Sequence, residues 1–294
     1  MKQIAMKQIA IVSGKGGTGK TTVCASLAEL AKNKVIADCD VEAPNLHLLI
    51  DSELLREKDF YGSKIAEIDR EKCRECGECV TVCRFGAIRD FSVDEIKCEG
   101  CAACVFICPH QAVSITDVIT GKTILSASPW GKFSHAKLNI GADGSGKLVT
   151  EVRKNALDCV TDGDIVIIDG SPGIGCVVIA SITGCDAILV VSEPTLSGKH
   201  DLIRVLDLAE HFGIKAYVCI NKYDLNPYMT EEISSHCTNR NVMVIGSIPF
   251  DREVGRAIIQ GIPVVRVRDS AAGKAVKDIW AGLRKELFSG KEYC

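Results

Sequence analysis

Residues 13–22 are Ser13-Gly14-Lys15-Gly16-Gly17-Thr18-Gly19-Lys20-Thr21-Thr22, and this stretch decides the fold. It contains the spacing G-x-x-x-x-G-K-T, directly after an apolar strand-like run and directly before a helical pattern. Glycines at these positions let successive backbone N–H groups turn toward phosphate oxygens at a helix N-terminus. The alternative, a plain glycine-rich turn, accounts for none of this context. We therefore predict a phosphate-binding loop, with Lys20 on the terminal phosphates and the Thr21 hydroxyl on Mg²⁺.

Outside this loop, short β-branched runs alternate with helical stretches from residue 8 onward. That alternation is typical of a mostly parallel sheet covered on both faces, so we predict a doubly wound α/β domain. The alternation stops near Phe60 and returns after about Ser126. We expect residues 6–59 and 119–294 to form the α/β domain and residues 60–118 a small inserted α+β module, with 120–146 an unassigned return connection. The predicted strands are 9–13, 35–38, 164–169, 187–192, 216–221 and 242–248, and the predicted helices are 20–31, 147–157, 197–212, 230–239, 252–260 and 271–288.

Composition excludes several classes of protein. Of the 294 residues, 47% are hydrophobic and 25% charged, which excludes a disordered or fibrous chain. The formal net charge of -3 gives no electrostatic reason to expect nucleic acid as a partner. The longest apolar stretch, residues 175–191, contains Asp186, so we expect a buried helix and strand and no stable membrane insertion. Without an export leader we expect a cytoplasmic protein. Residues 1–5 repeat as 6–10, which leaves the true start open between Met1 and Met6.

Eight of the sixteen cysteines lie between Cys73 and Cys108. The run Cys73-x2-Cys76-x2-Cys79-x3-Cys83 returns 25 residues later as Cys98-x2-Cys101-x2-Cys104-x3-Cys108-Pro109. This is the bacterial ferredoxin spacing, which predicts two 4Fe–4S clusters, the fourth cysteine of each run serving the other cluster. The alternative is a pair of zinc sites, but zinc would favour paired C-x2-C knuckles over these triple runs. One departure from the ferredoxin pattern is Arg84, which stands where the second run has Pro109. The predicted ligands are Cys73, Cys76, Cys79 and Cys108 for cluster 1, and Cys98, Cys101, Cys104 and Cys83 for cluster 2.

The remaining cysteines lie mostly in apolar runs, where a thiol behaves as a small hydrophobe. We expect them to be buried in the core of the protein. They are Cys24, Cys39, Cys159, Cys176, Cys185, Cys219, Cys237 and Cys294.

Carboxylates follow two of the predicted strands. Asp38 and Asp40, at spacing two, project to the same side of the strand's carboxyl end, the edge where a doubly wound sheet binds ligand. Asp169 ends another apolar strand and precedes a glycine turn, which suits an acid holding the Mg²⁺ shell before a mobile switch. A helix cap or turn is the alternative for Asp38 and Asp40.

The sequence GKGGTGKTT resembles the deviant Walker A box of the MinD/ParA/Mrp branch of P-loop ATPases. With the cysteine repeat, the whole chain resembles MinD-superfamily ATPases that carry an inserted ferredoxin domain. The resemblance implies an ATP-dependent homodimer, or a heterodimer with a paralogue, in which Lys15 reaches the partner's nucleotide; a solvated surface lysine is the alternative. It also implies that Asp40 orients the attacking water, that Asp38 lies near the metal, and that Asn221, Pro249 and Asp251 lie at the adenine.

The expected site residues are therefore three catalytic groups, a nucleotide-binding set and a magnesium set. The catalytic residues are Lys15, Lys20 and Asp40. The nucleotide-binding residues are Gly14, Lys15, Gly16, Gly17, Thr18, Gly19, Lys20, Thr21, Thr22, Asn221, Pro249 and Asp251, and the Mg²⁺ residues are Thr21, Asp38 and Asp169. The segment 192–201 also resembles this group, but suggests no mechanism, and His200 is expected to cap a helix.

Three hypotheses remain for the use of ATP hydrolysis. In the first, the cofactors ATP/ADP, Mg²⁺ and two 4Fe–4S clusters serve electron transfer, or Fe–S or metal-cofactor assembly, on an unknown partner protein. The second is an Mrp-type scaffold, against which the lack of any C-x-x-C outside residues 73–108 counts. The third is a MinD/ParA-like positioning ATPase with a redox-sensing ferredoxin module.

Overall fold

The computed structural model describes residues 6–161 and 164–288, which form two compact units. The first unit contains residues 6–57, Thr123–Lys137 and 144–288. The second contains Lys58–Lys122 and Leu138–Asp143. The first copy of the repeated pentad, residues 1–5, lies outside the described residues.

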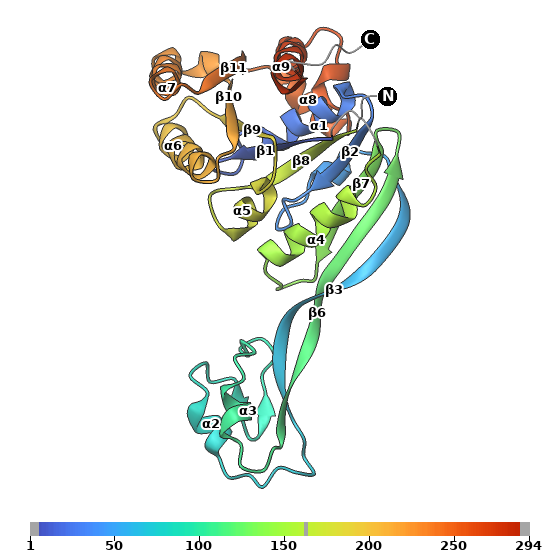
Figure 1. Cartoon of the computed structure of the whole chain (residues 1–294), viewed down its shortest axis with the longest axis vertical. Helices are drawn as coiled ribbons and strands as arrows, with labels where there is room; N and C mark the ends of the chain where they lie inside the picture. The colour runs from blue at the N-terminus through green and yellow to red at the C-terminus, as the bar shows by residue number, and fades with distance from the viewer. Residues whose placement is uncertain (1–5, 162–163, 289–294) are drawn as a thin grey trace. The chain divides into compact units, whose positions relative to one another are not determined.

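The described residues contain a nine-stranded sheet with the order β11-β10-β9-β1-β8-β2-β7-β6-β3 (Figure 1). The seven strands from β11 to β7 run parallel to one another, so the prediction of a doubly wound, mostly parallel sheet is confirmed. β1 lies between β8 and β9, and the order along the sheet reverses there, which is where such sheets bind ligands. These seven strands are β1 (Lys7–Ser13), β2 (Lys34–Asp38), β7 (Gly131–Leu138), β8 (Ile165–Pro172), β9 (Ala187–Ser192), β10 (Lys215–Asn221) and β11 (Met243–Ile248).

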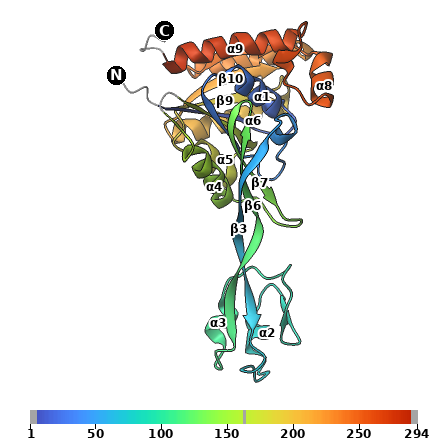
Figure 2. The ribbon, with the colours of Figure 1, turned by 90° about the vertical axis from the view of Figure 1, so that its right-hand side faces the viewer.

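Helices cover both faces of this sheet, because successive strand side chains alternate between faces and both sets are apolar. Ile9 and Ile11 belong to a core cluster with α1 and α9, whereas Ala10 and Val12, equally buried, alternate with them along β1. α1 (Lys20–Leu30), α8 (Arg252–Ile259) and α9 (Ala271–Phe288) lie on one face (Figure 1, Figure 2). On the other face lie α4 (Gly146–Leu157), α5 (Cys176–Ile182) and α6 (Leu196–His211), with α7 (Pro227–Asn239) against α6 and β11. No helix among the described residues is long and apolar enough to cross a membrane.

Two long strands were not predicted. β3 (Glu53–Ile68) begins with seven exposed residues, so its sequence carries no alternation of apolar and polar side chains. β6 (Val113–Ser128) and β7 lie in and beside the connection 120–146 that sequence analysis left unassigned. They form a hairpin in which Ser128 Oγ donates to the carbonyl of Gly131 at 2.8 Å, and Trp130 in the turn is buried. β3 therefore lacks the alternation of buried and exposed side chains on which strand prediction depends.

The second unit repeats its structure at the offset found in the sequence. α2 (Glu78–Val82) and α3 (Ala103–Ile107) lie 25 residues apart. Two hydrogen bonds cross between the copies: the Asp69 N–H donates to the Ala112 carbonyl and the Asp94 N–H to the Ala87 carbonyl, both at 2.7 Å. β4 (Ile88–Arg89) and β5 (Ser92–Val93) pair antiparallel. The internal repeat is therefore a repeat of backbone structure as well as of sequence.

Two minor expectations need correction. His200 does not cap a helix, because it lies inside α6, whose N-cap is Thr195 with its Oγ1 accepting from the Gly198 N–H at 2.9 Å. Cys176 is exposed at the start of α5, and Cys159 is half-buried. Cys294 lies outside the described residues. The remaining scattered cysteines, Cys24, Cys39, Cys185, Cys219 and Cys237, are buried as expected.

Candidate functional site

The loop between β1 and α1 is held from the side of β10. Asn221, at the end of β10, donates through Nδ2 to the Thr18 carbonyl at 2.8 Å. Gly19 has φ of 90°, and a Cβ at this position would lie 2.4 Å from Asn221 Nδ2. Glycine is therefore required at residue 19 both for its left-handed backbone and for the close approach of Asn221.

Lys20 lies in the first turn of α1 and is almost entirely buried among carboxylates. Its Nζ is 2.7 Å from Asp169 Oδ1 and 3.1 Å from Asp40 Oδ2, and the side chain is 6% exposed. Burial alone lowers the pKa of Lys20, but the charges of Asp169 and Asp40 outweigh it and raise the pKa well above its ordinary value. Lys20 is therefore a permanent cation.

Asp38 and Asp169, at the ends of the adjacent strands β2 and β8, differ in how their oxygens are used. The Asp38 carboxylate accepts from the N–H groups of Asp40 at 3.1 Å and Leu46 at 3.3 Å. Asp169 accepts from Lys20 through Oδ1, whereas its Oδ2 is buried without a hydrogen-bond partner among the described residues. Burial raises the pKa of both carboxyls, and the charge of Lys20 opposes this rise. A buried carboxylate oxygen without a partner beside the loop suits an added cation.

A cavity of about 710 Å³ opens at the same edge of the sheet. It brings together the phosphate-loop residues, Asp40 and the end of β10, and continues along the segment 248–255 toward α8. Gly14, Lys15, Thr18, Asp38 and Asp169 do not line it. The expected site residues that line it are Gly16, Gly17, Gly19, Lys20, Thr21, Thr22, Asp40, Asn221, Pro249 and Asp251.

Asp251 lines this cavity, but its carboxylate is committed to the protein. One oxygen accepts from the Glu253 N–H at 2.9 Å, which caps α8, and the other from Ser270 Oγ at 2.7 Å and the Ala272 N–H at 3.1 Å. Although burial alone would raise it, these bonds lower the pKa of Asp251. Asp251 therefore fixes the wall of the cavity.

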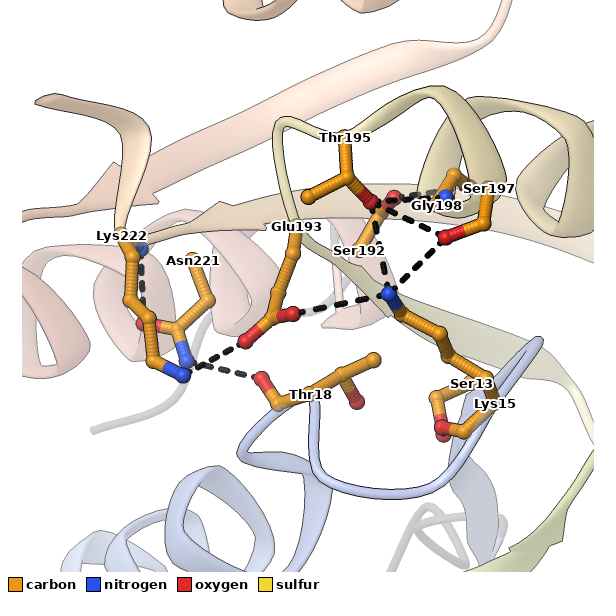
Figure 3. Close-up of polar contacts among 10 residues, drawn as sticks. All are labelled: Ser13, Lys15, Thr18, Ser192, Glu193, Thr195, Ser197, Gly198, Asn221 and Lys222. Carbon is orange, nitrogen blue, oxygen red and sulfur yellow. Dashed lines mark hydrogen bonds and ion pairs between the residues drawn. The ribbon is translucent and has the colours of Figure 1, made fainter. Parts of the chain in front are cut away.

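Lys15 does not line the cavity, and its side chain points toward the loop between β9 and α6 (Figure 3). Its Nζ donates to Ser197 Oγ at 3.1 Å and Thr195 Oγ1 at 3.3 Å, and is 3.8 Å from Glu193 Oε2. Glu193 holds Lys222 at 2.6 Å through its other oxygen. Lys15 and Lys20, five residues apart in one loop, are therefore held by different groups of side chains.

In the second unit, the eight clustered cysteines line two separate small cavities. Three cysteines of one run and the fourth of the other contribute to each cavity. Buried Cys79 and Cys104 lie at matching positions in the two copies, as do exposed Cys76 and Cys101. The first cavity is lined by Cys73, Cys76, Cys79 and Cys108, and the second by Cys83, Cys98, Cys101 and Cys104.

Backbone N–H groups point at three of these sulfur atoms. The Ala87 N–H donates to Cys83 Sγ at 3.4 Å, and its counterpart Ala112 donates to Cys108 Sγ at 3.3 Å. The Ala66 N–H donates to Cys98 Sγ at 3.4 Å. Over residues 6–161 and 164–288, no three His, Cys, Asp or Glu side chains are grouped to hold a single metal ion.

Comparison with known proteins decides the family. The model of the CobQ/CobB/MinD/ParA nucleotide binding domain matches residues 9–264. The chain belongs to this family. Membership in the CobQ/CobB/MinD/ParA family makes the chain a P-loop ATPase, and the 710 Å³ cavity is its candidate nucleotide site.

Similar proteins extend over nearly the whole chain. An uncharacterized protein of Methanocaldococcus jannaschii is 33% identical, covering 96% of this chain and 98% of its own length. An iron-sulfur cluster carrier protein of Pyrococcus abyssi is 23% identical over 95% of this chain and 86% of its own length. Among solved structures, MinD of Pyrococcus horikoshii complexed with Mg-ADP has a TM-score of 0.59 at 19% identity, covering 98% of this chain and 100% of that one. The last likeness shows the fold.

Several residues without a motif-based role lie at or beside this CobQ/CobB/MinD/ParA site. Glu193 and Lys222 directly follow the strands β9 and β10, so the rule that ligands bind at strand carboxyl ends was a signal for both. Thr195 and Ser197 gave no such signal, because their contact with Lys15 depends on how the β9–α6 loop folds.

Proposed function

We propose that the chain is an ATP-hydrolysing, nucleotide-switched dimer that carries two 4Fe–4S clusters. ATP binding and hydrolysis are coupled to electron transfer, or to Fe–S or metal-cofactor assembly, on a partner protein. Residues 60–118 form the cluster-carrying module in this proposal. The observation that carries it is the division of eight cysteines between two cavities in the crossed sets described above.

The cysteine sets fit the clusters in chemistry and number. Four thiolates per cluster are required, and each cavity has four cysteines. Hydrogen bonds to thiolate sulfur stabilise negative charge there, as the Ala66, Ala87 and Ala112 N–H groups do. When bound, such clusters supply one-electron chemistry. The likeness to an iron-sulfur cluster carrier protein supports this assignment.

The first unit supplies the groups for ATP hydrolysis. The loop N–H groups at the start of α1 receive the phosphates, and Lys20 exchanges carboxylate oxygens for phosphate oxygens. Asp40, which lines the cavity and is 12% exposed at its side chain, orients the attacking water. Thr21 and Asp169, whose Oδ2 has no hydrogen-bond partner among the described residues, would hold Mg²⁺ together with Asp38, and the ion would supply positive charge to neutralise the phosphates.

Lys15 acts across the dimer in this proposal. Lys15 does not line its own chain's cavity, and once its ammonium leaves its contacts with Thr195 and Ser197 it reaches the γ-phosphate of a second copy. There it stabilises transition-state charge in the manner of an arginine finger.

Paired cysteine substitutions test the cluster assignment. The double variant Cys73→Ser with Cys108→Ser affects one cavity only, so about four of about eight irons per chain are expected to remain, as in either single variant. The matched double variant Cys73→Ser with Cys83→Ser affects both cavities and is expected to lose all iron. Anaerobic iron analysis and EPR measure this, together with ATP hydrolysis. Equal iron in the two double variants would contradict the crossed division, and wild-type protein without hydrolysis would contradict the ATPase assignment.

A further inference from the structure

The loop between β9 and α6 presents three oxygen acceptors to a single ammonium group. Thr195 Oγ1, Ser197 Oγ and Glu193 Oε2 lie 3.3, 3.1 and 3.8 Å from Lys15 Nζ. A lysine ammonium has three donors and no acceptor. In this arrangement two donors are used in hydrogen bonds and the charge faces a carboxylate.

This acceptor group has a fixed geometry. Thr195 Oγ1 also accepts from the Gly198 N–H at 2.9 Å, and Ser192 Oγ donates to the Gly198 carbonyl at 3.2 Å. A Cβ at Gly14 would lie 2.3 Å from Asp201 Cβ, so the phosphate loop lies directly against α6. The acceptors are therefore pre-positioned next to Lys15 (Figure 3).

Glu193 connects this arrangement to the nucleotide cavity. Its Oε1 is 2.6 Å from Nζ of Lys222, which lines the cavity next to Asn221. The Glu193 side chain is 16% exposed, so its charge is poorly solvated and depends on both lysines. Loss of the contact between Glu193 and one of these lysines therefore changes the strength of its contact with the other lysine.

We propose that Glu193, Thr195 and Ser197 form a holding site that keeps Lys15 in a resting position, with Glu193 and Ser197 as positioning residues. This inference rests on the proposed function of Lys15 in a dimer. To reach a partner's phosphate, Lys15 must give up its contacts with the holding site. The holding site thus opposes the ATP-dependent dimer and limits how readily it forms.

Two variants test the holding site. Ser197→Ala removes the contacts of Ser197 Oγ with Lys15 Nζ at 3.1 Å and with Thr195 Oγ1 at 3.3 Å, at an exposed helix position where alanine is well tolerated. Glu193→Gln removes the charge and keeps the shape. The matched control is Glu232→Gln, which breaks the Lys199–Glu232 ion pair of 2.7 Å between α6 and α7 without touching Lys15.

The first measurement is the acetylation rate of Lys15, followed by peptide mass spectrometry at low conversion. Lys7, paired with Asp186 at 2.7 Å, is the internal reference. The acetylation rate of Lys15 is expected to be about two- to fivefold higher in Ser197→Ala and Glu193→Gln than in wild type, which is the range for exposed polar contacts. In Glu232→Gln the rate is expected to equal that of wild type. Equal rates in all four proteins would overturn the holding site, whatever the function of the dimer.

The second measurement is dimerisation by sedimentation with a non-hydrolysable MgATP analogue. The two variants are expected to dimerise about two- to fivefold more tightly than wild type and the control. Faster acetylation with unchanged or weaker dimerisation would overturn the claim that the holding site opposes the dimer. If wild-type protein binds the analogue and stays monomeric, the proposed function fails, and the acetylation rates alone decide whether the contact exists.

Discussion

At the scale of single residues, Lys20 is the cation on which three buried carboxylates depend. Replacing it by Met leaves Asp38, Asp40 and Asp169 without their compensating charge. Breaking a buried pair in this way costs about 3–5 kcal/mol. Lys20→Met is therefore expected to lower the free energy of unfolding by that amount in urea titrations and to abolish nucleotide binding. Wild-type stability in this variant would mean that the carboxylates are neutral.

Asp40→Asn tests the role of Asp40 in ATP hydrolysis without a large loss of folding stability. The amide keeps the shape of a side chain that is 12% exposed and leaves the shorter Lys20–Asp169 contact of 2.7 Å intact. We expect a folded protein that binds ATP with near wild-type affinity and hydrolyses it at least about 100-fold more slowly, the lower end of general-base effects. Calorimetric binding and phosphate release measure the two properties. Hydrolysis at the wild-type rate would remove Asp40 from the catalytic residues.

Sequence predicted single residues well where a motif fixes their place. The loop spacing and the strand ends indicated one shared site for Lys20, Asp40 and Asp169, and the structure places these side chains within ion-pair distance. The sequence did not predict the surroundings of Lys15, because its contacts with residues 193–197 depend on how the β9–α6 loop folds. The roles of all these residues in catalysis stay predictions.

At the scale of elements, the junction of the phosphate loop with α1 depends on Gly19. Gly19→Ala places a Cβ against Asn221 Nδ2 at a left-handed position, whereas a Cβ at Gly16 meets nothing within 4 Å. We expect Gly19→Ala to unfold at a lower temperature by several degrees and Gly16→Ala to stay within about one degree of wild type. Differential scanning fluorimetry of the nucleotide-free proteins tests this. Equal changes in unfolding temperature in the two variants would show that Asn221 can move away from residue 19 without loss of stability.

His135, on β7, makes the stability of the first unit depend on pH. Its ring stacks on Phe133 at 4.6 Å and on His47 at 6.1 Å, and its buried Nδ1 has no partner within the described residues. Burial, with a smaller contribution from His47, lowers the pKa of His135 from 6.5 to about 4. Between pH 6.5 and pH 4 the unfolded chain therefore binds a proton at His135 that the folded chain does not bind. The free energy of unfolding is highest above pH 6.5 and decreases as the pH falls toward 4.

His135→Phe is expected to reduce this loss, because phenylalanine keeps the stacking on Phe133 and cannot be protonated. Urea midpoints of wild type and variant at pH 7 and pH 4.5 provide the comparison. The variant should lose less stability than wild type on acidification. An equal loss in both proteins would assign the acid sensitivity to other groups.

Elements were predictable from sequence in proportion to their burial. The six predicted strands lie within three residues of their observed bounds at β1, β2, β8, β9, β10 and β11, because each is a short apolar run, and all but β11 are mostly buried. β3 could not be predicted, because nearly all of its first twelve residues are exposed. Backbone hydrogen bonds between strands form with any side chain, so they produce no pattern of apolar and polar residues in the sequence.

At the scale of the whole molecule, the candidate nucleotide site and the cysteine cavities lie in different compact units. β3 and β6 are neighbours in the sheet; β3 carries the chain from the first unit into the second, and β6 carries it back. The repeat at offset 25 indicated the symmetry of the second unit, which its crossed hydrogen bonds display. No pattern in the sequence indicates whether nucleotide and clusters influence each other, because that depends on energy differences between states.

An anaerobic redox titration followed by EPR measures this coupling. We expect two reducible cluster signals whose midpoint potentials differ between MgADP and a non-hydrolysable MgATP analogue. By linkage, the potential shifts only if the reduced and oxidised protein bind the nucleotide with different affinity, and a tenfold difference corresponds to about 59 mV for one electron. Lys20→Met, which is expected to bind no nucleotide, should show equal potentials with both ligands. Equal potentials in wild-type protein as well would favour delivery of clusters to a partner over nucleotide-driven electron transfer, because delivery requires no difference in affinity between redox states.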